Sequence, residues 1–193
     1  GMTILKGIFK RQTSEKQLLE RLKDGDTAAA EQLYHHHARY LTAVCSRYLN
    51  NDEDVKDVLQ ESFIKIFSSI HTFQYKGEGS VRAWMSRIAC NESINYLKAT
   101  RRLSFSELSE NNMLIPEDPP DVEDIPAHVL QEFIRQLPEG YRVVFNLFVM
   151  EGRSHKEIAQ MLGIKVNTSA SQLFKAKSVL AKKIEQYRRD NHN

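Results

Sequence analysis

Residues 154–177 constrain the fold of this chain most, because their pattern predicts two short helices that meet at a tight turn. Ser154 and Glu157 have the spacing of a capping box, which starts a helix. Gly163 can adopt the left-handed conformation that ends that helix, and Ile164 follows it as an apolar plug. The pattern is therefore typical of a helix-turn-helix.

The second helix of this pair should start at Asn167 or Thr168 and carry small polar residues and lysines on its outward positions. Leu173, Ala176 and Leu180 are expected to face inward. Hydroxyl and amide groups can contact base edges or phosphates, and lysines neutralise phosphates. Two ordinary packed helices are the alternative, and the joint presence of cap, turn glycine and plug favours duplex DNA binding. The candidate DNA-binding residues are Lys165, Asn167, Thr168, Ser169, Ser171, Gln172, Lys175 and Lys177.

Hydrophobic residues elsewhere repeat with the helical period, and no convincing alternating strand pattern occurs. The predicted fold class is therefore all-α, with two small helical bundles. The first bundle and the helix before it are expected from helices at about 15–23, 27–48, 54–69 and 80–101. The second bundle is expected from helices at about 127–136, 139–149, 154–162 and 167–188.

Charge divides the chain more sharply than its formal net charge of +2 suggests. Residues 103–127 contain seven acidic residues, no Lys or Arg, and four of the five prolines. This composition predicts an acidic linker that is flexible in the free protein. The expected division is an N-terminal extension with a short helix (1–23), a first helical domain (24–102), the linker (103–127) and the helix-turn-helix domain (128–193).

The sequence offers no evident catalytic or metal-binding arrangement. Three successive histidines, at positions 35–37, would point in directions about 100° apart on a helix and cannot share one ion. Cys45 and Cys90 are far apart, and we expect two buried thiols in a reducing cytosol. We therefore expect no active site, no metal and no cofactor.

No signal peptide is evident, and no apolar run approaches the length of a membrane span. The expected location is therefore cytoplasmic, without membrane insertion. The opening Gly1-Met2 is typical of an expression scar and is not expected to contribute to the fold.

The ordered motifs of both halves resemble the sigma-70 family of bacterial RNA polymerase sigma factors, in particular its two-domain extracytoplasmic-function group. In the first half the resemblance rests on residues 54–63 (DVKDVLQESF), 79–89 (GSVRAWMSRIA) and the run from Asn91 to Arg102. In the second half it rests on residues 137–145 (LPEGYRVVF), Glu151-Gly152 and the helix-turn-helix. It covers roughly residues 24–102 and 128–185.

The resemblance implies a protein that binds core RNA polymerase, directs it to promoters and helps to open the duplex. It implies docking on a coiled coil of the largest polymerase subunit through Asp57, Gln60, Glu61 and Phe63. Asp57 and Glu61 are four residues apart, so both carboxylates share one helix face and can meet basic residues on a partner. Composition alone would favour a merely solvated acidic face.

The loop 72–79 and the helix after it match the part of the family that opens and reads the downstream promoter element. Capture of flipped bases from the melted non-template strand requires stacking surfaces and cations. Trp84 falls on the apolar stripe and is assigned to the core rather than to stacking. The candidates for promoter contact and melting are Phe73, Tyr75, Arg82, Arg87, Asn91, Lys98, Arg101 and Arg102.

The helix-turn-helix departs from the family pattern at two places. Ala170 stands where the family often has a cation, and residues 165–167 replace a common Ser-Glu-Gly stretch. The missing cation would remove about one phosphate contact. The slope of the logarithm of DNA affinity against the logarithm of salt concentration would therefore be smaller by about one unit, and Lys165 can compensate in part.

The family resemblance also implies regulation by an anti-sigma factor, around which the flexible linker would let the two modules close. Two other functions remain as alternatives. One is a stand-alone helix-turn-helix transcriptional regulator in which residues 24–102 sense a ligand or form a dimer. The other is a small helical metal-dependent hydrolase.

Overall fold

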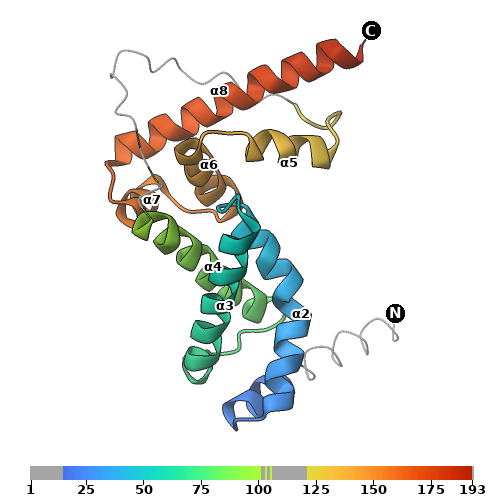
Figure 1. Ribbon diagram of the computed structural model, residues 1–193, viewed down its shortest axis with the longest axis vertical. Helices are drawn as coiled ribbons and strands as arrows, with labels where there is room; N and C mark the ends of the chain where they lie inside the picture. The colour runs from blue at the N-terminus through green and yellow to red at the C-terminus, as the bar shows by residue number, and fades with distance from the viewer. Residues whose placement is uncertain (1–14, 101–102, 104, 106–120, 193) are drawn as a thin grey trace. The chain divides into compact units, whose positions relative to one another are not determined.

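The computed structural model describes residues 15–100, 103, 105 and 121–192 (Figure 1). All regular structure in these residues is helical, which confirms the predicted all-α class. Most of the N-terminal extension and most of the predicted linker lie outside the described residues. Contacts between Cα atoms divide the chain into two compact units, Gly1–Ser93 and Ile94–Asn193.

The first unit begins with a helix at residues 15–23. It continues with α2 (Thr27–Ser46), α3 (Asp52–Ser69), a short 3₁₀ turn (Ile70–Thr72) and the greater part of α4 (Ser80–Ala99), whose last residues, from Ile94 onward, belong to the second unit. Local side chains start two of these helices. The carboxylate of Asp26 accepts hydrogen bonds from the N–H groups of Ala28 and Ala29, and the amide oxygen of Asn51 accepts from Glu53 and Asp54.

The core of the first unit is formed by one apolar stripe from each helix. In α2 the stripe includes Leu33, Leu41 and Val44, and α3 contributes Val58 and Ile66. Cys45 and Cys90 are both buried thiols, as expected, and the sulfur of Cys90 lies 3.5 Å from the hydroxyl of Tyr48. Further buried residues of the unit are Leu19, Leu22, Ala29, Tyr48, Leu49, Val55, Phe63, Ile70, Phe73, Val81, Met85 and Ala89.

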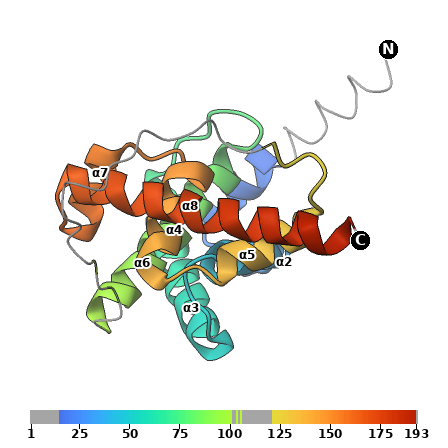
Figure 2. The ribbon, with the colours of Figure 1, turned by 90° about the horizontal axis from the view of Figure 1, so that it is seen from above.

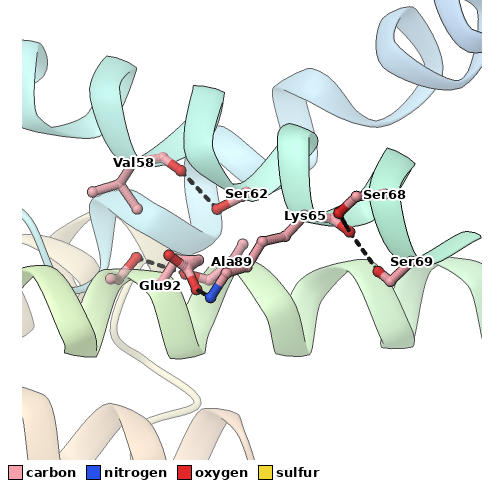
Figure 3. Close-up of polar contacts among 8 residues, drawn as sticks. Val58, Ser62, Lys65, Ser68, Ser69, Ala89 and Glu92 are labelled. Atoms are coloured by element: carbon pink, nitrogen blue, oxygen red, sulfur yellow. Dashed lines mark hydrogen bonds and ion pairs between the residues drawn. The ribbon is translucent and has the colours of Figure 1, made fainter.

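Two fully buried serines show how α3 and α4 keep polar groups satisfied within the core. The hydroxyl of Ser62 donates to the carbonyl of Val58 at 2.7 Å, and that of Ser93 donates to Ala89 at 2.8 Å (Figure 3). Because each hydroxyl is bonded within its own helix, neither serine needs a polar partner from a neighbouring helix.

Within residues 121–192, the second unit contains four α-helices, of which the last is the longest. They are α5 (Ala127–Arg135), α6 (Glu139–Phe145), α7 (His155–Leu162) and α8 (Val166–Asn191). Figure 2 shows α5, α6 and α7 arranged along α8, and all three contact it. The core comprises Leu137, Val143, Val144, Leu147, Ile158, Ala159, Leu162, Leu173, Ala176, Leu180 and Ile184.

A single helix was predicted at 139–149, but the α-helix α6 ends at Phe145. After Phe145 the chain widens into a π-helical segment (Asn146–Met150), in which the N–H of Glu151 donates to the carbonyl of Asn146. The segment buries Leu147 and leaves Val149 and Met150 exposed.

The end of the predicted linker is folded onto α8. The guanidinium of Arg188 binds both carboxylate oxygens of Asp124, at 3.0 and 2.6 Å, and donates to the carbonyl of Asp121. This cation lowers the pKa of Asp124, and Ile125 is buried. The last residues of the predicted linker, 121–126, thus have contacts with α8 that the sequence did not indicate.

The helix-turn-helix has the predicted local geometry. Ser154 and Glu157 form the complete capping box at the start of α7. Gly163 ends that helix with φ 66°, and Lys165 precedes α8 without a side-chain cap. The second helix begins at Val166, one residue earlier than predicted, and continues beyond the predicted end.

Among the described residues, no helix combines the length and apolar character that a bilayer span needs. In the same part of the chain, no group of three or more His, Cys, Asp or Glu side chains is placed to hold a metal ion.

We expect Gly163→Ala to destabilise the second unit by about 1 kcal/mol, because an L-residue is strained in the left-handed conformation. A Cβ at this position would meet no other described atom within 4 Å, so the cost is a backbone cost. Gly163→Asn should lose less, since Asn tolerates this conformation. Urea unfolding measures both variants, and an unchanged midpoint for Gly163→Ala would contradict the expectation.

The stability of the first unit should fall in mild acid because of His37. This side chain is 8% exposed, and no described group bonds its Nδ1. Burial, followed by the charges of Arg82 and His36, lowers the pKa of His37 to about 4. The unfolded chain, with an ordinary histidine pKa of about 6.5, therefore takes up the proton first as the pH falls.

This residue should reduce the free energy of unfolding by about 2 kcal/mol between about pH 8 and pH 5. His37→Leu should remove that part of the pH dependence, whereas exposed His35→Leu should keep it. Urea unfolding of the three proteins at both pH values measures the difference. Identical pH slopes for the wild type and His37→Leu would refute the assignment.

Candidate nucleic-acid interface

The outward face of α8 carries most of the predicted duplex-binding residues. Asn167, Lys165 and Lys177 are exposed, and Thr168, Ser171 and Lys175 are half-buried. Residues 167, 168, 171 and 175 lie on the side of the helix opposite Leu173 and Ala176, which are buried. The hydroxyl of Ser171 donates to the carbonyl of Asn167 at 2.9 Å, so its oxygen remains an acceptor. This face can therefore offer one amide, two hydroxyls and a cation to a duplex.

Ser169 and Gln172 do not belong to this face, and the prediction for them was wrong. Ser169 is 0% exposed and Gln172 is 1% exposed. The reason is helical spacing, since both adjoin the inward stripe that contains Leu173 and Ala176. Their polar atoms therefore lie inside the second unit rather than on its surface.

The buried hydroxyl of Ser169 is bonded to the first helix of the pair. It lies 2.8 Å from Nδ1 of His155, whose ring stacks on Phe148 with centroids 4.6 Å apart. Burial, followed by the charge of Lys177, lowers the pKa of His155. This contact joins α7 to α8 and so contributes to the orientation of the outward face.

The outward face of α4 forms a second polar stripe. Arg87, Asn91, Asn95 and Lys98 recur at helical spacing on the side opposite the buried Ser93. Arg87, Asn95 and Lys98 are exposed, and Asn91 is half-buried. Asn95 was missed from the sequence, although its spacing of four from Asn91 places it on this face. Cations and amides along one face suit a nucleic-acid strand.

For two aromatic residues beside this stripe, Trp84 and Phe73, the observed burial is the reverse of the predicted burial. Trp84, which was assigned to the core, is half-buried on the same face as Asn91. Phe73, which was expected to be available for stacking, is buried, and its ring stacks on Trp84 with centroids 4.7 Å apart. The loop thus folds Phe73 beneath the indole. In this conformation Trp84 is the better placed of the two to meet a base.

Tyr75 and Arg82 lie away from the α4 stripe. The hydroxyl of Tyr75 donates to Glu15 at 3.3 Å. Arg82 is exposed, and its guanidinium lies over the ring of Tyr40 on α2, at 4.6 Å from the centroid. The remaining predicted cations, Arg101 and Arg102, lie outside the described residues.

An open cavity of about 1120 Å³ lies between residues 15–23, α2 and the start of α4. Its lining includes Glu15, Glu78, Arg21 and Arg82, together with apolar side chains. A ligand sensor would need such a cavity. Charges of both signs line it, however, and they do not select one class of ligand.

The exposed face of α3 is acidic. Asp57, Gln60 and Glu61 are exposed, and their spacing places them on one side of the helix. Phe63 was predicted to belong to this surface, but it is 4% exposed. Its ring packs against Tyr34 at a centroid distance of 4.8 Å, so the prediction for Phe63 is corrected to a core position.

The sequence matches two family models, one toward each end of the chain. Sigma-70 region 2 matches residues 33–103, and Sigma-70, region 4 matches residues 127–180. The two matches thus span the α3 and α4 faces in the first half and the helix-turn-helix in the second.

Sequence similarity to other proteins extends over nearly the whole chain. The ECF RNA polymerase sigma-E factor of Haemophilus influenzae is 31% identical over 186 residues, which cover 90% of this chain and 97% of that protein. The protein of the same description from Escherichia coli K12 is 30% identical, with 92% and 97% covered.

Among solved structures, the chain is similar to the sigma factor RpoE of Bartonella quintana, crystallised with the anti-sigma factor NepR. The identity is 15%, the TM-score is 0.46, and 80% of this chain and 96% of that chain are covered. The family matches and the near full-length relatives show that the chain belongs to the sigma-70 family of RNA polymerase sigma factors, in its extracytoplasmic-function (ECF) group.

Proposed function

We propose a division of work among three helix faces. The acidic face of α3 binds core RNA polymerase, the outward face of α4 contacts the downstream promoter element as it melts, and the outward face of α8 reads the upstream element as duplex. As a sigma factor, the chain directs core RNA polymerase to promoters and promotes DNA-templated transcription initiation.

The observation that carries the proposal is the stripe on α4. Trp84, Arg87, Asn91, Asn95 and Lys98 bring an aromatic ring, cations and amides onto one helix face. An unpaired base can stack on an aromatic ring, amides can bond its edges, and cations can follow the backbone. A protein that bound only duplex DNA, through α8, would not need an aromatic ring, cations and amides on the outward face of α4. The stripe therefore favours a promoter-opening factor over a stand-alone regulator.

The resemblance to the family also supports an anti-sigma factor as the regulator of this chain. We propose that the chain acts through binding alone, without a reaction of its own, in the cytoplasm with the transcription machinery. Its partners would be core RNA polymerase and promoter DNA, in duplex and melted form.

Run-off transcription with purified core polymerase and genomic promoter fragments tests the proposal directly. Added protein should give promoter-dependent transcripts. Trp84→Ala should reduce transcript yield on a duplex promoter about tenfold or more, because one stacking contact is lost. If Trp84→Ala impairs duplex melting, a template whose downstream element is already unpaired should give the variant part of the lost transcript yield. No promoter-dependent initiation, together with tight duplex binding by the protein alone, would favour the stand-alone regulator.

Lysines on the helix-turn-helix should set the salt dependence of duplex binding. For Lys175→Ala, we expect weaker upstream DNA binding by the holoenzyme and a salt slope smaller by about one unit, because one phosphate contact is lost. Lys16→Ala, at an exposed lysine of the helix at residues 15–23, serves as the matched control. Binding measured from low to moderate salt gives the slopes, and an equal slope for Lys175→Ala and the wild type would exclude a phosphate contact by Lys175.

A further inference from the structure

The start of α8 contains one fully buried side chain, and that side chain is polar. Within residues 166–171 it is Ser169, at 0% exposed, whereas the buried apolar side chains of α8 begin only at Leu173. Lys165 gives the helix no side-chain cap. The candidate base-contacting residues of this part of α8 are Asn167, Thr168 and Ser171. Their direction therefore depends on how Ser169 is held.

Ser169 is held by an imidazole whose own position is fixed outside α8. Nδ1 of His155, the first residue of α7, lies 2.8 Å from Oγ of Ser169, and the tautomer decides which atom donates. The ring of His155 stacks on Phe148 of the π-helical segment, with centroids 4.6 Å apart and planes at 20°. The capping box of Ser154 and Glu157 fixes the start of α7 beside it. The imidazole can thus act as a fixed reference for α8.

A hydrogen bond restricts the rotation of a helix in a way that apolar packing does not. Burial of apolar surface has no preferred direction, whereas a hydrogen bond weakens steeply as its angle closes. For stability alone, two apolar side chains of the same shape would serve about as well as this pair. What the polar pair adds is control of direction.

Small rotations of α8 have large effects on contacts with base edges. Side-chain tips lie about 5–6 Å from the axis of a helix, so a rotation of about 20° moves them by about 2 Å. A hydrogen bond tolerates a change of only about 0.5 Å in length. Lysine side chains are long and flexible, so they can still reach phosphates after such a rotation. A rotation would therefore reduce base selectivity more than total affinity.

We propose that the hydrogen bond between His155 and Ser169 sets the rotation of the start of α8 and thereby the base selectivity of upstream promoter recognition. The inference rests on the proposed reading of the upstream element by α8 and adds the pair of residues that fixes its selectivity. His155 is a positioning residue in this role, because it acts through Ser169 and needs no contact with DNA.

The test uses holoenzyme assembled from the full-length protein and purified core polymerase. The probe is a library of duplex promoter fragments that share the downstream element of a promoter active in run-off transcription and have a randomised upstream element. Sequencing of the bound fragments gives the base preference at each position. Ser169→Ala and His155→Phe should each reduce the preference about fivefold or more, because displaced side chains lose their base contacts. His155→Asn should keep more of it than His155→Phe, since its amide has a polar atom where Nδ1 stands.

A double variant separates positioning from stability. His155→Phe combined with Ser169→Ala replaces both partners by apolar groups, so its melting temperature should be close to that of the wild type. Its base preference should nevertheless stay low. Ser178→Ala is the matched control on α8, because the hydroxyl of Ser178 donates to the carbonyl of Phe174 within the same helix, at 2.9 Å. This control should keep the wild-type preference.

Each result decides the question. Lost preference in the double variant, with a wild-type melting temperature, supports the proposal. Recovery of both properties in the double variant overturns it and reduces the hydrogen bond to a stabilising contact. Wild-type preference in Ser169→Ala also overturns it, as does an equal loss in Ser178→Ala. Promoter-dependent initiation by a wild type without any upstream preference would overturn the reading by α8 itself, and this inference with it.

Discussion

The burial of one apolar stripe per helix is the constraint on which the rest of this structure depends. A small helical bundle has few interior positions, so each helix must give one face to the core. In α8 this face contains Leu173, Ala176 and Leu180, and in α3 it contains Val58 and Ile66. The opposite faces remain for partners. The position of each stripe therefore decides which side chains can contact DNA or polymerase.

Polar groups inside the units also serve this arrangement. Ser62 and Ser93 are satisfied within their own helices, whereas Ser169 is bonded to His155 on another helix. The first kind of contact allows close packing at little cost. The second joins α7 to α8. If α8 rotated about its axis while α7 stayed in place, the buried hydroxyl of Ser169 would lose its hydrogen-bond partner. Both kinds keep the functional faces turned outward.

The sequence predicted the helices well because their signals are local. Ser154, Glu157 and Gly163 define the start and end of α7 through contacts within a few residues. The π-helical segment after Phe145 was not predictable in this way, because side chains such as Leu147 satisfy tertiary packing there. The fold of residues 121–126 was missed for a similar reason, since Arg188 holds them from more than sixty residues away.

By itself, the sequence determined the all-α class, the helix-turn-helix and the order of motifs that marks a sigma factor. These depend on periodicity, caps and spacing, which a linear chain displays. Only the tertiary structure decided which candidates face outward. It buried Ser169, Gln172, Phe63 and Phe73, and it placed Trp84 beside Asn91 on the outer side of α4. The physical reason is that a helical wheel gives relative angles, whereas the absolute direction of the core is set by the helices that pack against it.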